Sequence, residues 1–319
     1  MKIFIIVLVC VLALFLIILP SILFFYAGGK MKRMLKKSDK KISSMPGMDI
    51  SFYNNGPMKE AANKGLEFMD TLQHKDIYMT SFDGYKLHAY YYPNPNGETK
   101  KIFLGMHGFK SGPRHEYAPY IKKYFELGFS LILPDERAHY LSEGKYITLG
   151  CNEQYDTIDW AKKIVSMFGE DIQILIQGVS MGGASVNLAA GLDLPKQVIG
   201  IISDCAYTSF NDIMENVMHK FGNFNPKPII WMLDLYLKLF LHIDLKKSSP
   251  IESVKNAKVP ILYVHGKLDQ IVPVECSQKL YDACSSRKKL WIVDEANHAE
   301  CIGYRLDEYF NNIKEFFNL

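Results

Sequence analysis

A serine in this chain stands in a pattern that suits a nucleophile. Residues 178–182 read Gly-Val-Ser-Met-Gly and are followed by Gly183, which gives the pattern G-x-S-x-G. Glycine and serine each make up about 7% of residues, so a chain of this length meets the pattern by chance about one time in ten. Its setting is more specific, because it follows a strand-like run at 172–177 and precedes a helical stretch at 181–192. This strand–turn–helix setting predicts a strained turn that projects the Ser180 hydroxyl above a sheet.

A serine hydroxyl needs a base to become a good nucleophile. Of the nine histidines, His298 follows the strand-like run 289–293 near the end of the chain. The acid that holds its imidazole in one tautomer is expected after the preceding strand. Asp269, in the loop after the run 261–264, is the preferred candidate, and Asp204, after the run 198–203, is the alternative. The predicted nucleophile, acid and base are therefore Ser180, Asp269 and His298.

Two backbone N–H groups are expected to stabilise the negative oxygen of a tetrahedral intermediate. Met181 begins the helix after the serine, where N–H groups are unpaired and the helix dipole is positive. The loop after the strand-like run 102–106 reads His107-Gly108-Phe109, so the Phe109 N–H is the second candidate. We expect the His107 side chain to brace this loop. Each such donor is worth about 3–4 kcal/mol of barrier.

From residue 101 onward, short apolar runs alternate with helical stretches. The runs lack polar alternation, which predicts an α/β fold with a mostly parallel sheet covered by helices on both faces. Two earlier runs, 76–80 and 86–92, flank a Phe-Asp-Gly turn and predict an antiparallel hairpin at the edge of that sheet.

One insertion stands between two consecutive strands of this predicted sheet. It covers about 55 residues, from 205 to 259, which is too many for one crossover. Within it, residues 229–241 form an apolar helix-like run with several aromatic side chains. We interpret the insertion as a helical lid that lines an acyl pocket; a helix that covers the core is the alternative.

The N-terminal segment is strongly apolar. Residues 3–29 carry no charge, and a helix of about 20 apolar residues is long enough to cross a bilayer. A cleaved signal peptide has an apolar part of only about 7–15 residues, and a buried core helix is rarely so uniformly apolar. The sequence therefore predicts a transmembrane anchor at 1–29, a basic juxtamembrane segment and linker at 30–57, and one catalytic domain at 58–319.

Charge is concentrated beside this apolar segment. Residues 30–41 include seven basic side chains and one acid, so removing their net charge of +6 from the total of +3 leaves about −3 for the remainder. No basic face for nucleic acid is implied. Positive charge tends to stay on the cytoplasmic side, so a single-pass protein with a cytoplasmic catalytic domain is expected.

Six cysteines without a CxxC pair favour free thiols over disulfides or a zinc site.

Five motifs in one order resemble those of bacterial α/β-hydrolases. They are His107-Gly108, the stretch 134–144, the turn 178–183, Val264-His265-Gly266 with Asp269, and His298. The chain is similar to the serine-aminopeptidase-like and lysophospholipase-like group, often seen with an N-terminal membrane anchor, over about residues 76–319. The resemblance implies the α/β-hydrolase fold and the triad already named. That group usually has Arg-Gly-His-Gly where this chain has Arg-Ala-His-Tyr at 137–140, a departure at the expected rim of the pocket.

Together these features predict hydrolysis of an ester, thioester or amide through an acyl-enzyme. A carboxylic ester with an apolar, lipid-like acyl chain is the preferred substrate because of the aromatic lid and the anchor. No metal or organic cofactor is expected. Serine peptidase or aminopeptidase activity, acyl transfer on the same triad, and a non-catalytic membrane-tethered binding protein are the alternatives. The sequence does not indicate an oligomeric state.

Overall fold

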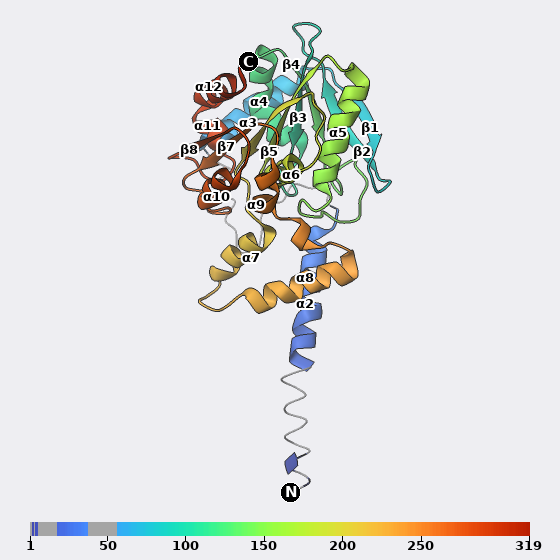
Figure 1. Ribbon diagram of the computed structural model, residues 1–319, viewed down its shortest axis with the longest axis vertical. Coiled ribbons are helices and arrows are strands. Elements are labelled where there is room, and N and C mark those ends of the chain that lie inside the picture. Colours follow the sequence, from blue (N-terminus) through green and yellow to red (C-terminus); the bar gives the residue numbers. More distant parts are fainter. Residues whose placement is uncertain (1, 3, 6–17, 38–55) are drawn as a thin grey trace.

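An eight-stranded sheet lies at the centre of the structure, a computed structural model that describes residues 2, 4–5, 18–37 and 56–319 (Figure 1). The strand order is β1-β2-β4-β3-β5-β6-β7-β8. The β1–β2 and β2–β4 pairs are antiparallel, and all other neighbours are parallel. The predicted parallel sheet with a hairpin at its edge is confirmed. The strands are β1 Lys75–Thr80, β2 Lys86–Tyr92, β3 Lys101–Met106, β4 Phe129–Pro134, β5 Gln173–Val179, β6 Val198–Asp204, β7 Ile261–Gly266 and β8 Lys288–Val293.

Helices cover both faces of the sheet, which explains why its strands read as continuous apolar runs. Side chains along β3 alternate between two cores: Phe103 packs toward α3, α4, α11 and α12, and Ile102 and Leu104 pack toward α5, α6 and α10. The covering helices are α3 Gly56–Asp70, α4 Pro113–Glu126, α5 Glu153–Phe168, α6 Met181–Ala190, α10 Glu275–Ala283, α11 Cys301–Tyr304 and α12 Leu306–Phe317.

The long insertion between β6 and β7 is helical, as expected. It contains α7 Phe210–His219, α8 Lys227–Leu241, α9 Pro250–Ser253, and two short 3₁₀ turns, η3 Leu245–Lys247 and η4 Val254–Asn256. Figure 1 shows α7 and α8 beyond the end of the sheet, with α8 lying across α2. The apolar run predicted at 229–241 is helix α8.

Helix α2, Leu19–Leu35, joins the N-terminal apolar segment to the rest of the structure. The helix continues past residue 29, the last of the uncharged stretch, and its last turns carry part of the basic cluster. Its C-terminal end is held firmly, because Leu35 is fully buried and its carbonyl accepts a hydrogen bond from the Ile147 N–H at 2.8 Å. The Lys37 Nζ also donates to the Ser142 carbonyl at 2.8 Å.

Aromatic side chains pack α2 against α8. The ring centroids of Phe24 and Tyr236 lie 5.4 Å apart, and those of Phe25 and Phe240 lie 6.0 Å apart. Such edge-on ring pairs contribute about 0.5–1.5 kcal/mol each beyond the area they bury. Helices α8 and α2 therefore form one packed unit.

In the part of the chain that the structure describes, no helix is both long enough and apolar enough to cross a membrane. Most of the predicted anchor at 1–29 falls outside the described residues, as does the 38–55 part of the predicted linker. The anchor therefore stays a prediction from sequence.

Gly28→Ala is expected to weaken the packing of α2 on α8. A Cβ at Gly28 would lie 2.2 Å from Cδ2 of Tyr236, whereas a Cβ at Gly29 would meet no atom within 4 Å. Hydrogen exchange of the α8 amides, measured on the full chain in detergent micelles, should be faster in Gly28→Ala. The control Gly29→Ala should exchange no faster than the parent, since alanine favours a helix by about 1 kcal/mol over glycine. Equal exchange in the two variants would contradict this packing.

Candidate active site

Ser180 occupies a strained turn between β5 and α6. Its φ of 55° and ψ of −112° lie outside the regions that side-chain-bearing residues usually adopt. Its N–H donates to the Asp204 carbonyl at 2.9 Å, which ties the turn to the end of β6. Strain of this kind costs on the order of 1–3 kcal/mol and persists where the surroundings fix it. Here it aims the Ser180 hydroxyl outward from the sheet.

Two glycines allow this turn to form. A Cβ at Gly182 would lie 2.1 Å from the Met106 carbonyl oxygen, and a Cβ at Gly178 would lie 2.1 Å from the Gly182 carbonyl oxygen. Either contact is far inside van der Waals distance, so any side chain would push α6 away from β3 or β5. The glycines of the G-x-S-x-G pattern therefore serve close backbone approach.

Three predicted side chains meet at this turn. The Ser180 Oγ lies 2.8 Å from the His298 Nε2, and the His298 Nδ1 lies 2.6 Å from the Asp269 Oδ2. The aspartate and the histidine come from the loops that follow β7 and β8. Because an ionised carboxylate only accepts hydrogen bonds, Nδ1 carries the proton and Nε2 is free to accept from the serine hydroxyl.

The alternative acid, Asp204, makes no hydrogen bond to the His298 side chain. It is fully buried below the turn, where its Oδ2 accepts a hydrogen bond from the Tyr309 hydroxyl at 2.8 Å. Burial raises the pKa of Asp204 to about 6. Its side chain thus supports the core, and the hydrogen bond to the histidine is made by Asp269.

Asp269 is held by more than the histidine. Its Oδ1 accepts hydrogen bonds from the N–H groups of Ile271 and Val272, both at 2.8 Å. Burial by itself would raise the pKa of Asp269, but the charge of His298 and the hydrogen bonds from His265 and His298 outweigh it and hold the pKa below its ordinary value. The carboxylate is therefore ionised and fixed in orientation.

His265 is a supporting residue whose role the sequence did not reveal. Its Nε2 lies 3.0 Å from both the Asp269 Oδ2 and the Val272 carbonyl oxygen, and its Nδ1 lies 2.6 Å from the Ser277 Oγ. Since a carbonyl can only accept, Nε2 carries the proton and Nδ1 accepts from the serine. In the sequence, only its position four residues before Asp269 indicated this supporting role.

Burial by itself would lower the pKa of His298, yet the charge of Asp269 and the hydrogen bond to it raise the pKa above the ordinary value of 6.5. The charges of Glu116 and Asp204 act in the same direction. The imidazolium form is thus stabilised, as a base that must carry a proton during a reaction requires.

The Phe109 and Met181 N–H groups are available to bind an oxyanion. In the described part of the chain, neither N–H group donates to another protein atom. Met181 is the first residue of α6, so its N–H also lies at the positive end of that helix.

Two buried histidines fix the loop that carries Phe109. The His107 Nδ1 donates to the Gly108 carbonyl at 2.8 Å, and its Nε2 accepts from the Glu136 N–H at 3.0 Å. On the other side of Phe109, the His139 Nε2 accepts from the Lys110 N–H at 3.0 Å. Burial lowers the pKa of both histidines, which keeps them neutral in the tautomers that these bonds need. His107 braces the loop as expected; the part played by His139 was not foreseen.

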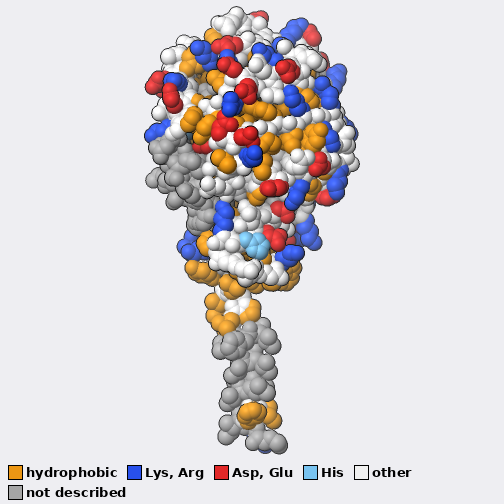
Figure 2. All heavy atoms as spheres, turned by 90° about the vertical axis from the view of Figure 1, so that its left-hand side faces the viewer, with side chains coloured by type: hydrophobic (Ala, Val, Ile, Leu, Met, Phe, Trp, Pro, Cys, Tyr) orange, Lys and Arg blue, Asp and Glu red, His pale blue; other side chains and the backbone are white. Residues whose placement is uncertain are grey.

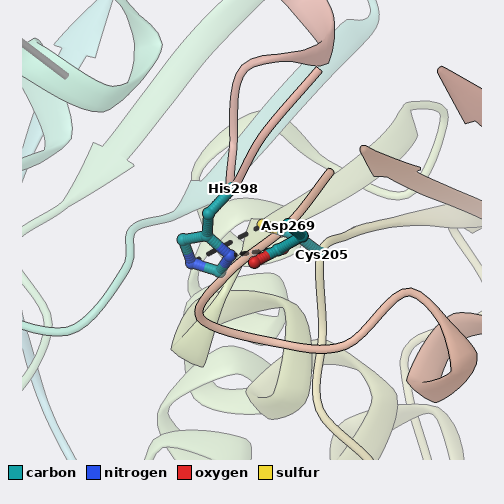
Figure 3. A group of neighbouring side chains, drawn as sticks. All are labelled: Cys205, Asp269 and His298. Atoms are coloured by element: carbon teal, nitrogen blue, oxygen red, sulfur yellow. Dashed lines mark hydrogen bonds and ion pairs between the residues drawn. The ribbon is translucent and has the colours of Figure 1, made fainter. Parts of the chain in front are cut away.

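One group of side chains in the described residues comes close enough to share a metal ion, namely Cys205, Asp269 and His298 (Figure 3). The Cys205 Sγ lies 3.9 Å from the His298 Nε2. Burial raises the pKa of the Cys205 thiol well above its ordinary value, which disfavours the thiolate that a metal binds. The same imidazole is already bound between Ser180 and Asp269. The donor set therefore fits a hydrogen-bonded triad with a neighbouring thiol better than a metal site.

An apolar cluster connects this site with helix α8. It includes Met181 and the partly buried Phe109 beside the serine, Leu233 and Leu237 of α8, and Leu35 of α2. Most members of this cluster have hydrocarbon or aromatic side chains, which is the environment that an acyl chain prefers.

Comparison with known proteins identifies relatives over most of the chain. Residues 138–317, more than half of the sequence, match the prolyl oligopeptidase family. The uncharacterized protein YqkD of Bacillus subtilis is 26% identical over 203 residues, which are 62% of this chain and 65% of YqkD. The uncharacterized protein YfhR of Escherichia coli K12 is 22% identical over 237 residues, 72% of this chain and 75% of YfhR.

Solved structures share the fold. The esterase Pf2001 of Pyrococcus furiosus matches 88% of this chain and 98% of its own with a TM-score of 0.63 and 22% identity. The acylaminoacyl peptidase of Pyrococcus horikoshii matches 79% of this chain and 43% of its own with a TM-score of 0.57 and 20% identity. The α/β-hydrolase fold predicted from sequence is thereby confirmed.

The raised pKa of His298 predicts how the reactivity of Ser180 depends on pH. The serine is activated only while His298 is neutral, so labelling by a fluorophosphonate should slow as the pH falls through the histidine pKa. Because that pKa is raised, the midpoint should lie above 6.5. Asp269, with its lowered pKa, should add no second step in this range. A labelling rate that stays constant down to pH 5.5 would contradict this arrangement, and Ser180→Ala serves as the unlabelled control.

Proposed function

The chain belongs to the prolyl oligopeptidase family of serine hydrolases, and from that premise we propose that it cleaves a carboxylic ester with an apolar acyl chain through an acyl-enzyme. One observation carries the proposal: the Ser180 Oγ lies 2.8 Å from the Nε2 of a histidine whose Nδ1 is bound to a buried carboxylate. That is the geometry of an activated nucleophile.

In the acylation step, the Ser180 Oγ attacks the ester carbonyl carbon while its proton passes to the His298 Nε2. The carbonyl oxygen becomes negative and is stabilised by the N–H groups of Phe109 and Met181. The intermediate then expels the alcohol, which takes the proton from Nε2, and the acyl group stays on Ser180.

Deacylation repeats this sequence with water. Water gives its proton to the His298 Nε2 as its oxygen attacks the acyl carbon, and the Ser180 oxygen leaves with that proton. Asp269 keeps its charge throughout and stabilises the imidazolium that forms in each half-reaction. The ester and one water molecule balance the two steps.

The preference for an apolar ester comes from the cluster that joins the serine to the lid. Its members beside the site and on α8 are hydrocarbon or aromatic, with Phe210 and Tyr207 adding to Met181 and Leu237. A polar peptide would leave its amide groups without hydrogen-bond partners against such a surface, which costs on the order of 1–3 kcal/mol per group.

Peptidase or aminopeptidase activity is the second candidate. It is supported by the family match and by the fold shared with an acylaminoacyl peptidase. Acyl transfer to an alcohol or amine uses the same residues, so it is distinguished from hydrolysis by product analysis with an added acceptor.

We also propose that the uncharged segment 3–29 anchors the enzyme as a single-pass membrane protein. The support is its length and apolar composition, and the basic cluster at 30–41 that follows it. The same cluster favours a catalytic domain on the cytoplasmic side.

A hydrolysis assay of the full chain in detergent micelles tests this function. The substrates are p-nitrophenyl esters of increasing acyl length and an acylaminoacyl anilide. Ser180→Ala should lower kcat by roughly a millionfold on every substrate. The control Ser185→Ala, on the same helix, should retain activity because its hydroxyl donates only to the Met181 carbonyl.

Activity should rise with acyl length and exceed that on the anilide. Efficient cleavage of the anilide with little ester hydrolysis would favour the peptidase instead. If Ser180→Ala retained the activity of the parent chain, the proposed nucleophile would be wrong.

A further inference from the structure

Helix α8 has two apolar faces. One face packs on the rest of the structure through Ile230, Leu233, Leu237 and Leu241, all buried. The second face follows the helical spacing i, i+3, i+4, i+7 and i+11, and consists of Pro228, Trp231, Met232, Leu235 and Leu239. On this second face, Trp231 is 65% exposed and Leu239 is 58% exposed. A helix of a soluble domain usually has polar residues there, so this face is built for an apolar environment.

The second face of α8 points away from the sheet. At 100° per residue it lies roughly opposite the buried face. Figure 1 shows α8 lying across α2, and α2 continuing past it on the side away from the sheet. In Figure 2, hydrophobic side chains gather at this base of the molecule, with lysine and arginine side chains just above them. The loop before α8 adds Phe221 and Phe224, which are 66% and 41% exposed.

Basic residues border this apolar base. Lys30, Lys32 and Arg33 lie in the second half of α2, and Lys227 begins α8. Lys238, on α8, is paired with Asp244 at 2.9 Å. An apolar face with an exposed tryptophan and a border of lysine and arginine matches the boundary between acyl chains and anionic headgroups.

We propose that the outer face of α8 and the loop before it rest on the surface of an anionic phospholipid bilayer. The chain itself indicates the occupant, because residues 19–29 of α2, the helix that packs on α8, belong to the uncharged segment 3–29. A second copy of the chain would not explain why the apolar face, the basic border and that segment share one end of the molecule.

The docking has a consequence for the substrate of the enzyme, and this consequence rests on the proposed function. The inner face of α8 belongs to the apolar cluster that reaches Met181 beside the serine. The helix that would rest on the bilayer therefore also contributes to the apolar surroundings of Ser180. The substrate class that fits both faces of α8 is a lipid ester drawn from the membrane.

Quenching of Trp231 by lipid tests the docking directly. The full chain is placed in nanodiscs of phosphatidylcholine and phosphatidylglycerol, with or without bromine on the acyl chains, and compared with Trp231→Phe. The chain has three tryptophans, of which Trp160 is fully buried in the core. Brominated lipid should quench the parent chain, and that quenched component should be missing from Trp231→Phe. Equal quenching in both proteins overturns the proposal, and is also the result expected if a second copy covers the face.

A charge placed on the face gives a second, functional readout. Leu239→Glu should lower hydrolysis of a vesicle-embedded lipid ester by about tenfold, since it replaces an apolar contact with the bilayer by a charge. Hydrolysis of a soluble short-chain ester should be unchanged. The matched control Leu306→Glu, on α12 at the far end of the molecule (Figure 1), should lower neither rate. Equal losses in the two variants overturn the proposal.

The two proposals fail separately. Quenching does not depend on turnover, so it reports docking even if Ser180 is inactive. Absence of soluble ester hydrolysis in the parent chain counts against the proposed function alone.

Discussion

The hydrogen bond between Asp269 and His298 is the interaction on which the site depends. Only a histidine held by its Nδ1 presents Nε2 to the Ser180 hydroxyl, and the 2.6 Å contact with the carboxylate provides that hold. The carboxylate is fixed in turn by two backbone N–H groups and by His265. The parallel order β5-β6-β7-β8 makes this possible, because it brings the carboxyl ends of neighbouring strands to one edge of the sheet.

The remaining parts of the site are held in place before any substrate binds. The turn at Ser180 is strained but enclosed by close backbone contacts, and two neutral histidines fix the loop on both sides of Phe109. Donors fixed in this way need no reorganisation when negative charge develops on the substrate, which is the usual source of their effect on rate. Around these rigid parts, α8 and α2 supply apolar side chains, so the catalytic residues and the apolar surroundings of the site come from different elements of the fold.

The sequence predicted the fold class and the three residues that the structure brings together, because both depend on local patterns in a fixed order. It could not identify His139 or His265 as supports, since their partners are set by tertiary packing. His139 bonds a backbone N–H 29 positions away. Nor could it show that Gly28 lies inside α2, where the ring of Tyr236 leaves no room for a side chain, because that contact joins residues more than 200 positions apart.

The most direct measurement of the central interaction compares Asp269→Asn with Asp204→Asn in kcat for ester hydrolysis. The amide at 269 would leave the His298 imidazole in the wrong tautomer, so kcat should fall by about 10⁴ with little change in KM. The amide at 204, where the carboxylate accepts from Tyr309, should change kcat by less than about tenfold. If Asp204→Asn caused the large loss and Asp269→Asn retained most of the activity, the assignment of the acid would be wrong.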